Sequence, residues 1–324
     1  MNILVTGADG MLGTNLVRLL LKRGHSVTGF LHHSSKSTTL DKLDIKKVYG
    51  DLLDSGSLDK AMHNIDVVIH TAASTSVWPA RSEFVKKVNI QGTQNIIDKV
   101  LEHKISKLVY VGSASSVNTS KTEKSKYTFP GEKFGLDYID SKYEAFKLVM
   151  NAVSEKNLPA TAILPTYMIG AYDSLPGSGK MITSFANGKL KFFTKGGRNF
   201  IHVEDVATAI ANSIDLKYNG KYFIAGNENL SYKMFFKKLA SITEKKELKT
   251  KIPSWIVLLV GVFGSAYGKI FRQQPLITYQ MARISYVNQF VYCQQSMDEL
   301  QVNLTPVDKA IQDGYKWFRK NNYC

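Results

Sequence analysis

The sequence predicts an α/β fold, in which helices cover both faces of a doubly wound parallel sheet and the C-terminal part adds a smaller lobe. Apolar runs of strand length alternate with helical patterns through the first half of the 324-residue chain, as in parallel sheets. The first run, residues 2–6, opens directly into three glycines and then a leucine-rich helical pattern. Beyond Gly170 the alternation weakens, which is why a second lobe is expected there.

The glycines of the first turn indicate a site for a dinucleotide. Gly7, Gly10 and Gly13 recur at every third position, so the backbone bends sharply and a ligand can approach it. The following helix presents unpaired N–H groups to a pyrophosphate, and we assign its first residues, Met11 and Leu12, to the same site. The spacing matches the common dinucleotide fingerprint only partly. The alternative is a turn that only packs the helix on the strand.

The second predicted strand, residues 25–31, ends in a polar segment that contains His32, His33 and Lys36. Strand ends at this position meet the adenosine ribose in doubly wound folds. The segment lacks the acidic residue that binds the 2′-hydroxyl of NAD, whereas imidazoles and a lysine suit the 2′-phosphate of NADP. We therefore expect NADP, with NAD as the alternative cofactor and a polar turn without cofactor contact as the other interpretation.

Three further strands are predicted at residues 46–51, 66–70 and 107–111, and ligands of such sheets bind at the carboxyl ends of the strands. The carboxylate of Asp51 could accept a hydrogen bond from the adenine amino group. Small residues after 66–70 leave room for a ligand to lie against the backbone. The candidate cofactor contacts at these strand ends are Asp51, Leu52, Thr71, Ala72 and Ala73.

A later predicted helix carries two side chains that suit acid–base chemistry. Tyr138 and Lys142 are four residues apart and share a helix face, and a nearby cation favours the phenolate of a tyrosine, whose ordinary pKa is about 10. Ser113, at the end of strand 107–111, could hold a substrate oxygen while the tyrosine passes the proton. Tyr143 and Lys147 repeat the spacing, but Tyr143 falls on an apolar stripe and is assigned to the core.

Several motifs occur together: Thr6-Gly7-x-x-Gly10-x-x-Gly13, Asn89-x-x-Gly92-Thr93, Gly112-Ser113, Tyr138-x-x-Ser141-Lys142, Leu164-Pro165-Thr166 and residues 200–207. This combination resembles the extended branch of the short-chain dehydrogenase/reductase superfamily, the NAD-dependent epimerase/dehydratase family, and implies a Rossmann-type fold. Residues 110–118 resemble the dihydroflavonol reductase and hydroxysteroid dehydrogenase group within it. The resemblance covers nearly the whole chain.

The resemblance implies a role for each matched residue. Tyr138 would be the catalytic acid and base, Lys142 would bind the ribose and lower the tyrosine pKa, and Ser113 would donate to the substrate carbonyl. The remaining matched cofactor contacts would be Asn89, Pro165 and Thr166. The family more often has two adjacent hydroxyl residues at the position of Gly112-Ser113, so Ser115 or Ser116 is the alternative carbonyl donor.

Four activities are weighed for a chain with this resemblance. We predict an NADP-dependent reductase that converts a ketone or aldehyde to an alcohol. The alternative is a nucleotide-sugar epimerase, because Arg198 matches a position that often binds sugar-nucleotide phosphates; Ser115 and Arg198 are the candidate substrate contacts. A dehydratase is disfavoured because Ala114-Ser115 replace its usual acidic pair. A non-catalytic redox sensor is disfavoured because such proteins commonly lack the tyrosine–lysine pair.

The composition favours a small-molecule enzyme over a nucleic-acid-binding protein. The net charge is +15, but 35 of the 42 cations (42 minus 7 arginines) are lysines scattered through the chain. The two cysteines, Cys293 and Cys324, make neither a disulfide framework nor a metal-ligand pattern. A strand already begins at the second residue, which leaves no room for an export signal. We therefore expect a cytoplasmic protein without a metal.

We divide the chain into a dinucleotide-binding domain, residues 1–169 with 199–228 returning to it, and a substrate lobe, residues 170–198 and 229–324. The uncharged run 253–268 in this lobe is shorter than a bilayer span and contains three glycines, so we predict no transmembrane span. The run could line the pocket, pack internally or lie on a membrane.

The apolar character of that run predicts an apolar or aromatic ketone as the substrate, because arginines that would bind a phosphorylated sugar are few. A lysine-rich solvated loop is expected at residues 118–133. The sequence is compatible with a homodimer.

Overall fold

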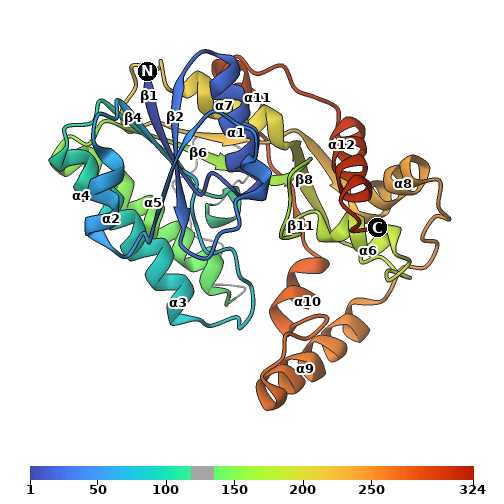
Figure 1. Cartoon of the computed structure of the whole chain (residues 1–324). Helices are drawn as coiled ribbons and strands as arrows, with labels where there is room; N and C mark the ends of the chain where they lie inside the picture. The colour runs from blue at the N-terminus through green and yellow to red at the C-terminus, as the bar shows by residue number, and fades with distance from the viewer. Residues whose placement is uncertain (118–134) are drawn as a thin grey trace.

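The computed structural model describes residues 1–117 and 135–324 of the chain (Figure 1). The lysine-rich loop expected at residues 118–133 lies outside the described residues, and so does the side chain of Ser116.

A seven-stranded sheet forms the centre of the molecule, and all of its strand pairs are parallel. The strand order is β3-β2-β1-β4-β5-β6-β9. The chain thus adds strands on one side of β1 up to β3, and then on the other side of β1 from β4 onward. The predicted α/β class and parallel sheet are therefore confirmed. The strands are β1 (Asn2–Thr6), β2 (Ser26–His32), β3 (Lys46–Gly50), β4 (Val67–His70), β5 (Lys107–Val111), β6 (Ala160–Pro165) and β9 (Tyr222–Ala225).

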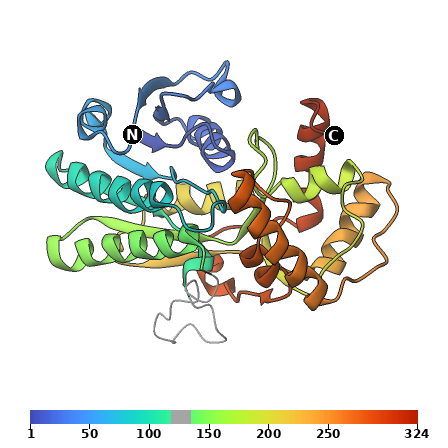
Figure 2. The same cartoon turned by 90° about the horizontal axis from the view of Figure 1, so that it is seen from below.

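Helices cover both faces of this sheet because successive strand residues point to opposite faces and both faces are apolar. In β1, Ile3 and Val5 pack under α1 (Met11–Lys22) and α7 (Val203–Ser213). Leu4 faces the other way, toward α2, α4 and α5. Figure 2, the view from below, shows the two layers on either side of the strands. The helices of the second layer are α2 (Ser55–Met62), α4 (Gly92–Glu102) and α5 (Asp137–Lys156).

A second, smaller sheet is built around β8 (Gly197–His202). This strand pairs with β7 (Tyr167–Ile169), β10 (Glu228–Ser231) and β11 (Asn288–Gln289). Its core is aromatic: the rings of Phe200 and Phe235 stack with centroids 4.5 Å apart. The helices packed on it are α6 (Lys180–Ala186), α8 (Tyr232–Thr243) and α12 (Val307–Lys320). Within residues 199–228, β9 thus joins the large sheet whereas β8 belongs to the small one.

The remaining helices lie in connections. Helices α9 (Ser254–Phe271) and α10 (Tyr279–Ser285) pack on each other and extend from the body of the molecule (Figure 1). A short α3 (Glu83–Lys86) and a π-helical segment, η2 (Lys87–Gln91), precede α4. The short elements are η1 (Thr38–Leu40), η3 (Ala114–Ser116) and α11 (Gln294–Glu299).

The structure corrects the assignment of Tyr143 to the core. This side chain is only half-buried, and the Lys147 ammonium lies 5.4 Å from the centre of its ring. The buried face of α5 is instead formed by Ile139, Lys142, Ala145, Phe146, Val149 and Ala152. The sequence stripe failed because Lys142, a charged residue, occupies the inner face beside the apolar ones.

Candidate active site

At two positions of the first turn, the close packing of the backbone leaves room only for glycine. Gly7 has a φ of +67°, which only glycine adopts readily, and a Cβ there would lie 2.8 Å from the Cα of Ala72 at the end of β4. A Cβ on Gly13 would lie 2.1 Å from the Gly7 carbonyl oxygen. Both residues therefore bring backbone segments into contact, in agreement with the purely structural interpretation of the turn.

Gly10 is different, because the protein leaves space beside it. Its φ is −70°, and a Cβ there would meet only the Gly7 carbonyl oxygen, at 3.4 Å. Gly10 directly precedes α1, and within the described residues no side chain caps this helix and no acidic residue occupies its first turn. The first N–H groups, at Met11 and Leu12, are thus available to an anion. An open glycine at an uncapped helix N-terminus fits a dinucleotide pyrophosphate.

The end of β2 gathers the residues expected at the adenosine end of the cofactor. Exposed His32 lies 3.8 Å from the carboxylate of Asp51 (Nε2 to Oδ2), and His33 and Lys36 are also exposed. Leu52 is buried after Asp51. Sequence reasoning missed Asp9, whose carboxylate accepts a hydrogen bond from the Ser35 hydroxyl and so ties the glycine turn to this segment.

The ends of β1 and β4 are joined by hydrogen bonds through Thr6. The Thr71 hydroxyl donates to the Thr6 carbonyl oxygen (2.6 Å), and the Ala72 N–H donates to the Thr6 hydroxyl (3.2 Å). The ring of His70 is buried between the hydroxyls of Thr6 (2.8 Å) and Thr93 (3.1 Å). Burial lowers the pKa of His70 to about 3, so the ring is neutral at physiological pH. Thr71, Ala72 and Ala73 are consequently held half-buried at the crevice.

Asn89 is buried in the π-helical segment, and its amide group is engaged by the protein. Its Oδ1 accepts from the Ser74 N–H (2.7 Å), while Nδ2 donates to the Ser74 carbonyl (3.0 Å) and the Ser141 hydroxyl (2.9 Å). Both amide donors are used. Asn89 therefore joins the loop after β4 to α5, which makes it a residue that positions the site.

The predicted serine and tyrosine meet at the carboxyl end of β5. The Ser113 hydroxyl lies 2.7 Å from that of Ser115 and close to the Tyr138 phenol, whose charged form it favours. Burial raises the pKa of Tyr138, whereas Ser113 and the charge of Arg198 lower it. Of the two described serines, Ser113 is the one in contact with the phenol.

Lys142 is buried one helical turn further along α5. Its ammonium donates to the Val111 carbonyl oxygen (2.7 Å) and lies 5.0 Å from the centre of the Tyr110 ring. Burial lowers the pKa of Lys142 to about 7. The charge of Arg198, from β8, also lowers the pKa of Tyr138, a contribution that the sequence did not suggest. The role expected for Lys142 toward the phenol stays a prediction.

Arg198 is held by two tyrosines. Its Nε donates to the Tyr232 hydroxyl (2.9 Å), and the guanidinium lies 4.9 Å from the centre of the Tyr167 ring. Burial disfavours its charge, but the interactions with Tyr232 and Tyr167 outweigh burial and raise the pKa of Arg198. The charge of this guanidinium therefore acts on the phenol of Tyr138.

The end of β6 is fixed by an asparagine that sequence reasoning missed. The Thr166 hydroxyl donates to Oδ1 of buried Asn199 (2.8 Å), and the Asn199 amide donates to the Asn227 carbonyl (3.1 Å). Pro165 is buried beside Ala225 of β9. Asn199 thus connects the expected nicotinamide-bordering residues to the small sheet; its position next to Arg198 was the only sequence signal.

An ion-pair network that the sequence did not reveal anchors the start of α5. Arg81 Nη1 lies 2.7 Å from both the Asp137 and the Asp140 carboxylates, and the Ser82 N–H donates to Asp137 (2.6 Å). Asp137 is buried and directly precedes Tyr138. The network therefore fixes the helix turn that carries the phenol.

Helix α10 borders the same turn. Its Ile284 belongs to a small apolar cluster with Leu136 and Ile139, against which Tyr138 packs.

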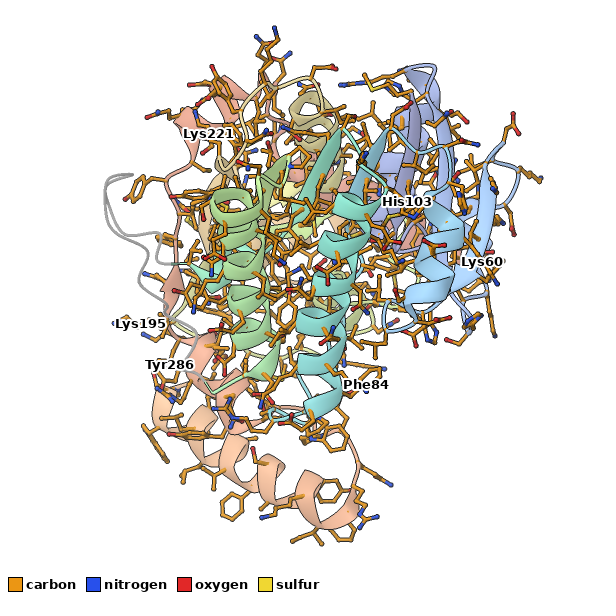
Figure 3. All side chains as sticks on the ribbon, turned by 90° about the vertical axis from the view of Figure 1, so that its left-hand side faces the viewer. Lys60, Phe84, His103, Lys195, Lys221 and Tyr286 are labelled. Carbon is orange, nitrogen blue, oxygen red and sulfur yellow. The ribbon has the colours of Figure 1, made fainter. Side chains whose placement is uncertain are left out.

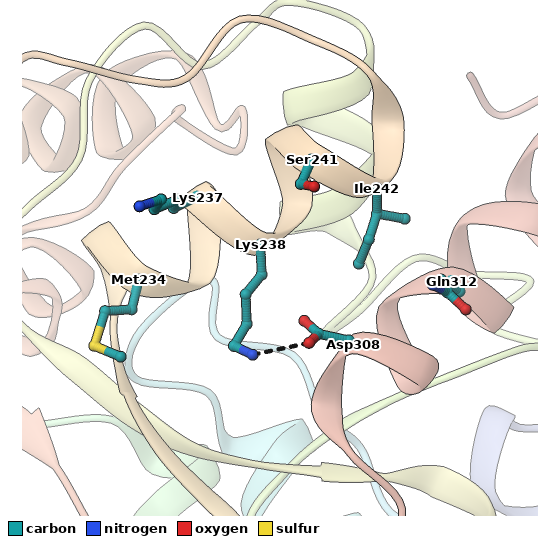
Figure 4. A pocket seen from close by; sticks show the side chains of 7 residues that line it. All are labelled: Met234, Lys237, Lys238, Ser241, Ile242, Asp308 and Gln312. Carbon is teal, nitrogen blue, oxygen red and sulfur yellow. Dashed lines mark hydrogen bonds and ion pairs between the residues drawn. The ribbon is translucent and has the colours of Figure 1, made fainter.

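A hollow between α8 and α12 is separate from these residues (Figure 4). It is lined by Met234, Lys237, Lys238, Ser241, Ile242, Asp308 and Gln312. Two of its charged side chains, Lys238 and Asp308, form an ion pair in which the ammonium lies 3.0 Å from the carboxylate. The hollow contains none of the motif residues, so the chemistry is assigned to the sheet edge instead.

A glycine turn suited to pyrophosphate, combined with the serine–tyrosine contact and the buried lysine, defines a dinucleotide-dependent enzyme of the extended short-chain dehydrogenase/reductase type. The chain belongs to the NAD dependent epimerase/dehydratase family, whose model matches residues 3–225. It is accordingly an enzyme with an NAD-type cofactor and a small-molecule substrate.

Two relatives match almost the whole chain. Sterol demethylase protein B of Methylococcus capsulatus is 27% identical over 99% of this chain and 99% of its own length. A putative dihydroflavonol 4-reductase of Synechocystis is 27% identical over 98% of this chain and 95% of its own length. The solved structure titled "Crystal structure of gox2253" superposes with a TM-score of 0.85 at 27% identity, covering 99% of this chain and 98% of that one. The resemblance seen in the motifs is therefore confirmed.

Proposed function

We propose that this protein is an NADP-dependent, cytoplasmic reductase that interconverts a ketone and a secondary alcohol on a small molecule with apolar substituents. The proximity of Ser113 to the Tyr138 phenol carries the proposal, because a proton donor and a second hydroxyl then lie together at the end of β5. The name of the Synechocystis relative, a putative reductase, supports the same activity.

In the proposed reaction the bound dinucleotide supplies a hydride to the carbonyl carbon. Ser113 donates a hydrogen bond to the carbonyl oxygen and Tyr138 donates its proton to the same oxygen, which completes the alcohol. Lys142 would hold the ribose. Arg198 favours the phenolate left on Tyr138, since a neighbouring cation stabilises the charged form. In the reverse direction the phenolate accepts the alcohol proton.

NADP is favoured by the cations at the end of β2. We expect NADPH to bind more tightly than NADH, and Lys36→Ala to weaken NADPH by about tenfold without changing NADH, because a charge-assisted bond to the 2′-phosphate is lost. Titration of each nucleotide by fluorescence measures both affinities. Lys60→Ala, which removes an exposed lysine of α2 (Figure 3), is the matched control. Equal affinities in the wild-type protein would contradict the NADP assignment.

The apolar character of the substrate is supported by the cluster around Ile284, which borders Tyr138. Residues 253–268, for which lining the pocket was one expected role, give less support to an apolar substrate. The large side chains of α9 are exposed, and the buried residues of this helix are Val257, Gly261 and Gly268.

An epimerase acting on a nucleotide sugar is the second candidate, and Arg198 distinguishes the two. As a reductase, the protein is expected to show no saturable binding of UDP-glucose by calorimetry. Saturable binding that Arg198→Met abolishes would instead support the epimerase.

Arg198 also predicts a pH effect on the reductase. Removing its charge raises the pKa of Tyr138, so in Arg198→Met the alkaline rise of alcohol oxidation moves to higher pH. Arg198→Lys keeps a positive charge and is expected to retain most of the wild-type pH profile. An unchanged profile in Arg198→Met would contradict an electrostatic role.

A further inference from the structure

Helix α9 has its small residues turned inward and its large apolar residues turned outward. On the inner side, Gly261, Gly264 and Gly268 allow close contact with α10 and the preceding loop; a Cβ on Gly264 would lie 2.2 Å from the Ile277 carbonyl oxygen. On the outer side, large residues repeat at helical spacing: Trp255, Leu259, Phe263 and Ile270. A helix of a soluble surface normally has the reverse arrangement.

The outward face is exposed to an unusual degree. Within the described residues, Phe263 and Ile270 are each 72% exposed, Trp255 63%, and Leu259 49%. Figure 1 shows that the helix itself projects from the body of the molecule. By length and composition the helix could cross a membrane, yet only 17% of it is buried within the structure. A continuous apolar face of this kind marks an interaction surface.

The charge around the helix indicates which partner covers this face. No acidic residue occurs between Glu247 and Asp298, a stretch of 50 residues. Exposed cations stand near both ends of α9: Lys249, Lys251, Lys269 and Arg272. Such cations complement anionic lipid headgroups. A second copy would instead bring like charges to the same face.

We propose that α9 docks this protein onto an anionic lipid bilayer, with the helix lying in the plane of the membrane surface. Both ends of the helix are tied to the same body. Before the helix, the Ile252 N–H donates to the Phe193 carbonyl (2.9 Å). Near its end, Gly268 lies so close to the body that a Cβ there would lie 3.0 Å from the Trp78 indole nitrogen. Crossing the bilayer would break these contacts and the glycine packing on α10. An apolar helix face flanked by lysines is suited to the interface.

Docking has a consequence for the site. Helix α10, on which α9 packs, borders Tyr138 through Ile284. The proposed active site would then open near the lipid surface, within reach of an apolar substrate dissolved there. This consequence rests on the proposed function, whereas the docking itself does not.

The test is flotation of the full-length protein with vesicles. We expect it to float with phosphatidylcholine vesicles containing about 30% phosphatidylglycerol, and at least tenfold more weakly with phosphatidylcholine alone or in high salt. The pair Leu259→Asp and Phe263→Asp is expected to weaken binding by at least about tenfold, since two apolar anchors are lost. Alkaline carbonate is expected to release the bound protein.

The control adds the same charge elsewhere. Leu175→Asp with Tyr218→Asp replaces residues that are 88% and 54% exposed. The centre of the Tyr218 ring lies 5.1 Å from the ammonium of Lys221, which Figure 3 shows at the opposite end of the molecule from α9. This pair is expected to bind vesicles like the wild type. Failure of the wild type to float, or equal effects of both pairs, would overturn the proposal. So would resistance to carbonate, or a vesicle-free dimer, seen by light scattering, that only the α9 pair dissociates.

Discussion

Tyr138→Phe is expected to lower kcat for ketone reduction by about 10²- to 10⁴-fold, because the variant keeps the ring but loses the proton that the alcohol oxygen needs. The affinity for NADPH is expected to change little, since in the proposed reaction the phenol acts on the substrate oxygen, whereas the pyrophosphate would bind beside Gly10, where the protein leaves space. Single-turnover reduction with the best ketone from a substrate screen, together with nucleotide titration, separates the two quantities.

The chain offers a matched control on the same helix. Tyr143 also precedes a lysine by four residues, but it is half-buried beside Lys147 at the surface of α5. Tyr143→Phe removes the same atom and is expected to keep near wild-type turnover. If Tyr138→Phe were as active as Tyr143→Phe, the catalytic assignment would be wrong.

The second large effect concerns the two kinds of glycine in the first turn. Gly13→Ala is expected to destabilise the fold by about 3 kcal/mol or more, because the new Cβ would lie 2.1 Å from the Gly7 carbonyl oxygen and 2.7 Å from the Ala8 Cα, and backbone atoms cannot move aside. A loss of this size lowers the midpoint of thermal unfolding by roughly 5–10 °C.

Gly10→Ala is the informative partner of that variant. Its Cβ would meet only one protein atom, at 3.4 Å, and the backbone conformation is ordinary, so the apoprotein is expected to unfold at nearly the wild-type temperature. NADPH affinity is nevertheless expected to fall at least tenfold, because the methyl group occupies the space beside the helix N-terminus. Unchanged affinity in Gly10→Ala would mean that the turn only packs the helix on the strand.

Local patterns in the sequence were sufficient for the parallel sheet and for part of the site. The strand at 107–111 was predicted with the bounds of β5, and the glycine turn was found before α1, because a strand, a turn and a helix are each encoded by neighbouring residues. The four-residue spacing likewise put Tyr138 and Lys142 on one helix. Spacing alone could not tell where the Lys142 ammonium points, since that depends on the Val111 carbonyl of another strand.

The sequence by itself determined the class of fold, the family and the residue types of the catalytic motif. The tertiary structure decided which distant residues support them: Arg81 pairs with Asp137 across 56 positions, and Arg198 reaches Tyr138 from a different sheet. It also decided that the large side chains of α9 face outward. The large residues of that helix recur at helical spacing, but this pattern does not tell whether they face the body or the outside. Only the close packing of Gly261 and Gly264 on a neighbouring segment selects the inner face.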